Sequence, residues 1–248
     1  MIIKLLFLFF LNVSLFAETI NLALSANVSY AIKEIKKEFS KLYPDIKIKV
    51  IVGSSGKLTA QILNGAPYDI FMSADMKYPQ KLFSNAKAIT EPLVYVQGKL
   101  AYLSVKKRDF SRGLEILNSD AIRKIAIASP KTAPYGKASF EALSNFGILN
   151  KIENKIIYGE SAAQTLSYTI SAVDLGFVSA SALHSPKLKR FKKHQNWELV
   201  DAKFYTPIDQ GIVILKHGER KASAQAFYDF ILSAQAKEIF IKYGYNVI

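Results

Sequence analysis

Strand-like and helix-like hydrophobic patterns alternate along the chain, and few folds accommodate that alternation. Residues 19–24 are strand-like, and apolar residues then recur at helical spacing up to Leu42, before Pro44 ends the helix. A second strand is expected over 46–52 and a third, buried strand over 69–73. Strands separated by helices form parallel sheets with helices on their faces. A ligand site in such a sheet lies at the carboxyl ends of the strands.

The alternation returns further along the chain with a different spacing. We therefore predict an α/β protein with two lobes, each a mostly parallel sheet flanked by helices. The first lobe is expected to comprise residues 18–93 and 206–248, and the second residues 94–205. The two crossings, near Leu93 and Tyr205, would form a two-strand hinge, with a ligand cleft between the lobes. The downstream strand-like segments are 93–105, 125–128, 156–158, 175–178 and 208–215.

The first 17 residues have the three-part pattern of a cleaved export signal. Lys4 supplies the positive charge, a short apolar run follows, and Ala17 is the small residue at the end. The run is shorter than the roughly 20 residues that span a bilayer, although an uncleaved anchor or a buried first strand would also be apolar. The absence of cysteine argues against a lipid anchor. We expect a signal peptide over 1–17, cleaved after about Ala17, and a soluble periplasmic protein.

The formal net charge of +13 permits three interpretations. Nucleic-acid binding or membrane-surface binding would require clustered basic side chains or an amphipathic basic helix. The basic residues are instead spread along the chain, and the densest run, at 187–193, is interpreted as a solvated loop. We expect a solvated surface whose general field attracts anions, and no nucleic-acid partner.

The sequence lacks the usual catalytic and metal-binding patterns. Residues 53–57, Gly-Ser-Ser-Gly-Lys, lack the spacing and the Lys-Ser/Thr ending of a phosphate-binding loop, and no Gly-x-Ser-x-Gly elbow occurs. An exported hydrolase with Ser55 or Ser161 as nucleophile is an alternative, but no base adjoins either serine in the sequence. We predict a binding protein rather than an enzyme, without catalytic residues or cofactor. None of the three histidines has metal-ligand spacing; they are His184, His194 and His217.

Small polar residues gather at four expected strand-to-helix turns. Such a turn presents unpaired backbone N–H groups at the positive end of a helix, which together form an anion site without a charged side chain. Each turn alone has a simpler explanation: a cap at Asn27 or Ser161, a Gly/Ser loop, or a core-facing Tyr135. Four such helix starts, two from each expected lobe, predict a site for an oxyanion. The turns are 25–27, 53–56, 133–136 and 159–163.

These turns, in this order, resemble those of the periplasmic molybdate-binding proteins, the solute receptors of molybdate and tungstate ABC importers. The most specific segment is 64–75, Asn-Gly-Ala-Pro-Tyr-Asp-Ile-Phe-Met-Ser-Ala-Asp. The resemblance implies the two-lobed type II periplasmic-binding-protein fold and a monomer that delivers its ligand to an ABC importer permease in the inner membrane. Other matching segments are 22–35, 53–62, 134–136, 174–178, 226–230 and 239–245.

The resemblance also implies the ligand residues. Asn27 and Tyr135 match the branch of the family that uses an asparagine and a tyrosine at these turns. Ser179 stands where some members have a tyrosine that hydrogen-bonds the oxyanion. The ligand would be molybdate or tungstate, held by hydrogen bonds with no other metal; the alternative is the same fold binding sulfate or thiosulfate. Carried over by position, the ligand residues are Ala26, Asn27, Ser54, Ser55, Tyr135, Ala162 and Ser179.

Overall fold

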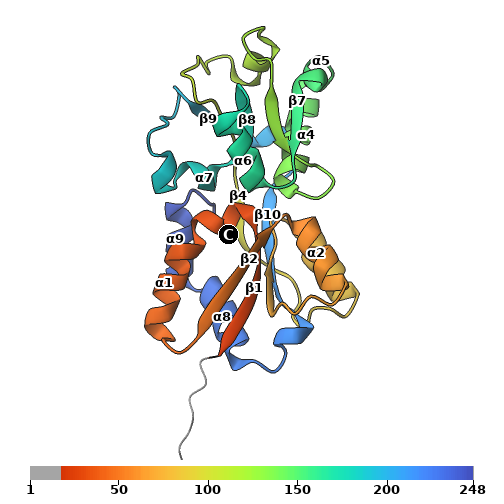
Figure 1. Cartoon of the computed structure of the whole chain (residues 1–248), viewed down its shortest axis with the longest axis vertical. Helices are drawn as coiled ribbons and strands as arrows, with labels where there is room; N and C mark the ends of the chain where they lie inside the picture. Colours follow the sequence, from red (N-terminus) through yellow and green to blue (C-terminus); the bar gives the residue numbers. More distant parts are fainter. Residues whose placement is uncertain (1–17, 248) are drawn as a thin grey trace, which may run out of the picture.

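The computed structural model describes residues 18–247, which form two lobes stacked along the long axis of the molecule (Figure 1). Each lobe is built on one five-stranded sheet flanked by helices, which confirms the predicted two-lobed α/β fold. The expected signal peptide, 1–17, lies outside the described residues. Within residues 18–247, no helix has the length and apolar character needed to cross a membrane.

The first sheet has the strand order β2-β1-β3-β10-β4. Its central strand β1 lies parallel to both β2 and β3, whereas β10 pairs antiparallel with β3 and β4. The strands are β1 (Thr19–Ser25), β2 (Lys47–Gly53), β3 (Ile70–Met72), β4 (Leu93–Gly98) and β10 (Ile208–Ile214).

Helices cover both faces of the first sheet because successive strand side chains point to opposite faces. Leu22 and Leu24 of β1 pack with helices α1, α8 and α9, whereas Ala23 packs with α2 and α3. Phe39 of α1 meets Phe227 of α8 edge to face, with ring centroids 5.1 Å apart. The helices are α1 (Ile32–Leu42), α2 (Ser55–Leu63), α3 (Lys77–Ser84), α8 (Ala222–Leu232) and α9 (Ala234–Lys242), with 3₁₀ turns η1 (Ala26–Tyr30) and η6 (Lys216–Gly218).

The second sheet has the order β7-β6-β8-β5-β9 and the same division of its two faces. Tyr102 and Phe177 pack with α4 on one face, and Ala101 and Val178 pack with α6 and α7 on the other. The strands are β5 (Leu100–Leu103), β6 (Ile125–Ala128), β7 (Ile156–Gly159), β8 (Leu175–Ser179) and β9 (Trp197–Leu199). The helices are α4 (Pro134–Phe146), α5 (Leu149–Ile152), α6 (Ala162–Ser171) and α7 (Ala180–Leu183), with 3₁₀ turns η2 (Gly113–Asn118), η3 (Glu153–Lys155), η4 (Pro186–Leu188) and η5 (Ala202–Phe204).

Both sheets are mixed rather than mostly parallel. In each sheet the three strands connected by helices are parallel, and two further pairings are antiparallel. The antiparallel pairings arise at β4, β5, β9 and β10, the strands next to the two crossings. A strand that leaves a lobe and a strand that returns to it run in opposite directions, so they pair antiparallel.

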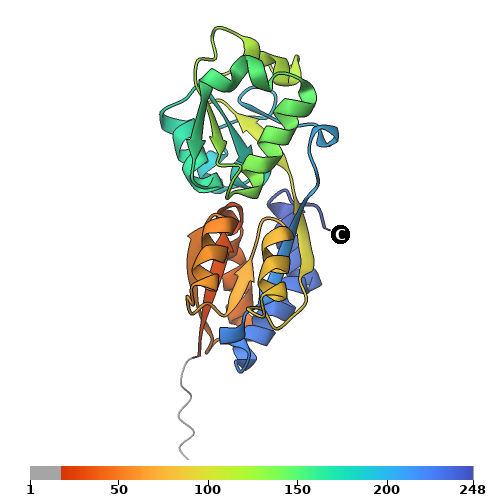
Figure 2. The same ribbon diagram turned by 90° about the vertical axis from the view of Figure 1, so that its right-hand side faces the viewer.

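The chain passes between the lobes twice, on one side of the molecule (Figure 2). One passage joins β4 to β5 at Lys99, and the other joins β9 to β10 over 200–207. The first crossing lies beyond the predicted position near 93, because β4 continues the first sheet as far as Gly98, which pairs with Ile208. Strands β4 and β5 belong to different sheets but are separated only by Lys99. The β-rich sequence over 93–105 therefore contains no signal that marks the boundary between the lobes.

Candidate functional site

A small cavity lies between the lobes where four helices begin. Its volume is about 10 Å³, the scale of one water molecule. The first lobe contributes the starts of η1 and α2, and the second lobe contributes the starts of α4 and α6. The cavity is lined by Ser25, Ala26, Asn27, Gly53, Ser54, Ser55, Ala74, Ala133, Pro134, Tyr135 and Ala162.

The structure brings together six of the seven residues proposed from the resemblance, all except Ser179. Ser179 ends β8, and its Oγ lies 2.9 Å from Oγ of Ser181. Ser181 in turn donates to the backbone oxygen of Asn27 at 2.9 Å. Ser179 therefore lies one hydrogen-bonded residue behind the cavity wall.

The cavity obtains its electrostatic character from backbone rather than from charged side chains. The described residues that line it are all uncharged. Helices α2, α4 and α6 direct their amino-terminal ends toward it, where the first N–H groups have no intrahelical partner. The aligned peptide dipoles place partial positive charge at these ends. The arrangement favours an anion without the cost of burying a cationic side chain.

The serines of the first lobe differ in how much donor capacity they retain. Ser55 Oγ accepts the Ala74 N–H at 3.0 Å and lies 2.8 Å from Ser25 Oγ. The Ser25–Ser55 pair uses one hydroxyl hydrogen between its members and leaves the other available. Ser54 precedes α2 but makes no side-chain capping bond, and its buried Oγ has no partner within residues 18–247. Ser54 therefore has its whole hydroxyl available for a ligand, whereas Ser25 and Ser55 together have one hydrogen to offer.

The cap explanation holds for one turn and fails for another. Ser161 caps α6, because its Oγ accepts the Gln164 N–H at 3.3 Å. Asn27 makes no cap, and its side-chain nitrogen instead donates to Gln210 Oε1 at 2.9 Å and to the Tyr245 hydroxyl at 3.1 Å. Asn27 Oδ1 is buried and has no hydrogen-bond partner in the described part of the chain.

A buried polar network behind the cavity was missed by the sequence analysis. Gln210 of β10 accepts from Asn27 and from the Tyr95 hydroxyl, each at 2.9 Å, and its Nε2 donates to the Tyr135 hydroxyl at 3.3 Å. Gln210 was detectable as a polar residue inside an otherwise apolar strand. Burial raises the pKa of the Tyr135 hydroxyl well above its ordinary value. Tyr135 therefore stays protonated and can donate.

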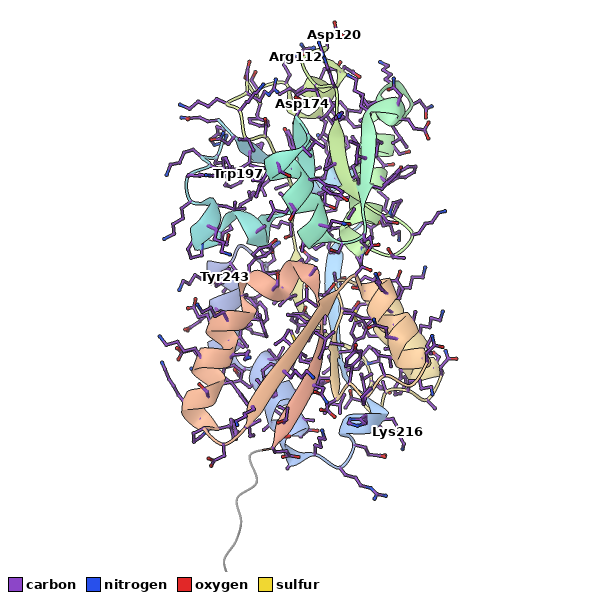
Figure 3. The ribbon with its side chains drawn as sticks, viewed as in Figure 1. Arg112, Asp120, Asp174, Trp197, Lys216 and Tyr243 are labelled. Atoms are coloured by element: carbon purple, nitrogen blue, oxygen red, sulfur yellow. The ribbon has the colours of Figure 1, made fainter. Side chains whose placement is uncertain are left out.

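Direct contacts between the lobes surround the cavity. The Gly56 N–H donates to the Thr132 backbone oxygen at 2.9 Å, and the Tyr78 hydroxyl donates to the Lys131 backbone oxygen at 3.3 Å. An exposed ion pair joins Lys57 to Glu160 at 3.0 Å. The lobes are thus closed on each other. Figure 3 shows Tyr243 at the level of this junction, whereas Arg112 and Lys216 lie toward opposite ends of the molecule.

The residues considered for catalysis have other partners. Ser55 contacts a serine and a backbone N–H, as described above, and Ser161 is a helix cap. His217 pairs with the buried carboxylate of Asp69 at 2.6 Å, and His194 pairs with Glu198. In the described ranges no three His, Asp or Glu side chains are grouped so that they could hold a metal ion.

The remaining histidine, His184, lies between the lobes. Its ring packs against Gly244, where an added Cβ would come within 2.6 Å of the imidazole. His184 is exposed on one side, and its partial burial at this contact, together with the charge of Lys99, lowers its pKa. His184 is thus part of the contact between the lobes.

Two α/β lobes joined by two crossings, with an uncharged cavity between them at four helix starts, define a two-lobed solute-binding protein. The chain belongs to the bacterial extracellular solute-binding protein family, whose model matches residues 20–246.

Individual relatives support this assignment. The chain is 32% identical to the molybdate-binding protein ModA of Azotobacter vinelandii, over 93% of this chain and 91% of the relative. It is also 32% identical to ModA of Rhodobacter capsulatus, over 90% of this chain and 86% of the relative. The solved structure of the Azotobacter vinelandii periplasmic molybdate-binding protein superposes with a TM-score of 0.86, covering 92% of this chain and 99% of that one. These similarities confirm the resemblance on which the site residues were proposed.

Proposed function

We propose that this protein is an extracytoplasmic receptor that binds molybdate or tungstate between its lobes and delivers the ion to the permease of an ABC importer. The main observation in support is that four helix starts converge on one uncharged cavity, in a chain that is 32% identical to two molybdate-binding proteins. In this proposal the leader 1–17 is removed, the mature protein is a periplasmic monomer, and it needs no cofactor.

The donors at the cavity suit a fully deprotonated tetrahedral oxyanion. Molybdate and tungstate carry two negative charges at neutral pH, so each of their oxygens accepts hydrogen bonds. Ser54 Oγ, the Tyr135 hydroxyl and the N–H groups at the helix starts supply donors. Hydrogen bonds to a charged group contribute about 1.5–3 kcal/mol each. Several such bonds support sub-micromolar affinity, about −8 kcal/mol or beyond, after the cost of association.

Discrimination against sulfate has to depend on size, because sulfate has the same charge and shape. The contacts between the lobes, such as that of Gly56 with Thr132, fix how far the walls approach each other. The cavity of about 10 Å³ is smaller than either ion, so the walls must move apart to admit a ligand. We propose that the larger ion then has all the donors in range, and that the smaller ion leaves some donors unpaired. An unpaired buried donor costs about 1–3 kcal/mol.

The proposal is tested by calorimetric titration of the ligand-stripped protein with molybdate, tungstate, sulfate and phosphate at physiological salt. We expect one-to-one binding of molybdate and tungstate, with sulfate at least about a thousandfold weaker, equivalent to about 4 kcal/mol. Tight binding of sulfate or thiosulfate alone would keep the site and change the ligand. No binding of any tetrahedral oxyanion would refute the proposal.

A further inference from the structure

Gln210 lies at the centre of the polar network behind the cavity, although it does not line the cavity itself. Its side chain is completely buried, on the strand that returns from the second lobe. A buried amide whose oxygen and nitrogen both have hydrogen-bond partners sets the direction of the bonds around it. Two of its partners, Asn27 and Tyr135, are residues of the cavity wall.

The directions of these bonds follow from the two ends of the amide. Oε1 receives hydrogens from Asn27 and Tyr95, each at 2.9 Å, so Nε2 is the end that faces Tyr135. Nε2 donates to the Tyr135 hydroxyl at 3.3 Å. A phenol has a single hydrogen, and Gln210 offers it no acceptor. Gln210 therefore does not use the Tyr135 hydrogen, and Tyr135 is one of the residues that line the cavity.

If the hydrogen bond between Gln210 and Tyr135 ran in the opposite direction, the Tyr135 hydroxyl could no longer donate to a ligand. A half-turn of the Gln210 amide would present Oε1 to Tyr135 and capture its hydrogen. It would also bring Nε2 against Nδ2 of Asn27, two donors facing each other, unless the Asn27 amide turned as well. Gln210 thus couples the two wall residues, so that neither can change its hydrogen-bonding role alone.

We propose that Gln210 is a positioning residue of the anion site, which directs the hydroxyl hydrogen of Tyr135 into the cavity. This inference rests on the proposed function, because it concerns how that site donates to its oxyanion. It predicts that the Tyr135 hydroxyl contributes fully to ligand affinity only when residue 210 donates a hydrogen bond to it, as Gln210 Nε2 does.

The test is a double-mutant cycle on molybdate affinity, measured by calorimetry with the full-length mature protein. Tyr135→Phe should weaken binding about tenfold in the wild-type background, the value of one hydrogen bond to a charged group. Gln210→Glu replaces the donor with an acceptor that captures the Tyr135 hydrogen. In the Gln210→Glu background, Tyr135→Phe should therefore weaken binding less than about threefold.

Charge and folding are controlled separately. The new carboxylate repels the anion equally with and without the Tyr135 hydroxyl. If Gln210→Glu acts only by this repulsion, Tyr135→Phe will still weaken binding about tenfold in that background, and this result would overturn the proposal. Gln80→Glu, on exposed α3, should change affinity less than about threefold. If Gln210→Glu does not fold, Gln210→Met replaces it in the cycle, and an unchanged penalty again overturns the proposal. Failure of the wild type to bind molybdate would instead refute the proposed function.

Discussion

Gly56→Ala should weaken ligand binding without weakening the fold. Gly56 is the second residue of α2, and its N–H bonds the Thr132 oxygen of the other lobe. An added Cβ would lie 3.0 Å from both Cα and O of Thr132, and 2.6 Å from the Tyr78 hydroxyl. Tyr78 can rotate away, but the Thr132 contacts are backbone. Ordinary contact begins at 3.4 Å, so the lobes must separate locally by about 0.4 Å.

The free-energy cost falls on the closed form alone. Overpacking costs about 1–3 kcal/mol and the stretched hydrogen bond up to about 1 kcal/mol. A total of about 2 kcal/mol lowers affinity about thirtyfold, because binding requires closure. Within the first lobe the change has the opposite sign, since alanine is favoured over glycine in a helix by up to about 1 kcal/mol.

The assay is calorimetric titration with molybdate, together with thermal unfolding of the ligand-free protein. We expect about thirtyfold weaker binding and an unchanged or raised unfolding temperature. Lys57→Ala is the control, because it removes an exposed ion pair between the same lobes and should change affinity less than about threefold. Unchanged affinity in Gly56→Ala, or a matching loss of thermal stability, would refute the reasoning.

Three further predictions use the same assays. Ser54→Ala should weaken molybdate binding about tenfold with little change in unfolding. Ser223→Ala removes another buried hydroxyl that has no partner within residues 18–247, in α8 far from the site, and should leave affinity unchanged. Gly98→Ala should lower both affinity and unfolding temperature, because its Cβ would lie 2.6 Å from Gln210 Nε2; an unaltered affinity would contradict this. His184 has a lowered pKa in the folded protein, so the unfolded chain binds its proton more readily as pH falls below 6.5. The free energy of unfolding should therefore decline below pH 6.5, and it should decline less in His184→Gln. An equal decline in the wild type and the variant would show that His184 is not the group responsible.

The helix starts were predictable because their signals are local. Ser25, Ser54 and Pro134 stand directly before or within the first turn of their helices, where the type of residue reflects the backbone geometry. The resemblance then indicated which of these turns meet. Six of the proposed residues line one cavity for that reason.

The network behind the cavity was not predictable in the same way. Gln210 reaches Asn27 and Tyr95 across 183 and 115 positions of sequence. Only the pairing of β10 within the first sheet brings these side chains together, and no local pattern records that pairing. The first crossing was misplaced for a related reason, since the end of β4 is set by its partner strand and not by a turn.

The central claim is that an oxyanion binds at the four helix starts, and anomalous diffraction from crystals grown with molybdate tests it directly. The account predicts one molybdenum peak between the lobes, with the ion's oxygens within hydrogen-bonding distance of Ser54 Oγ and the Tyr135 hydroxyl. The basic depression lined by Lys106, Arg123 and Lys124, next to Asp174 at the far end of the second lobe (Figure 3), is the contrasting location. A peak there, with none between the lobes, would contradict the account.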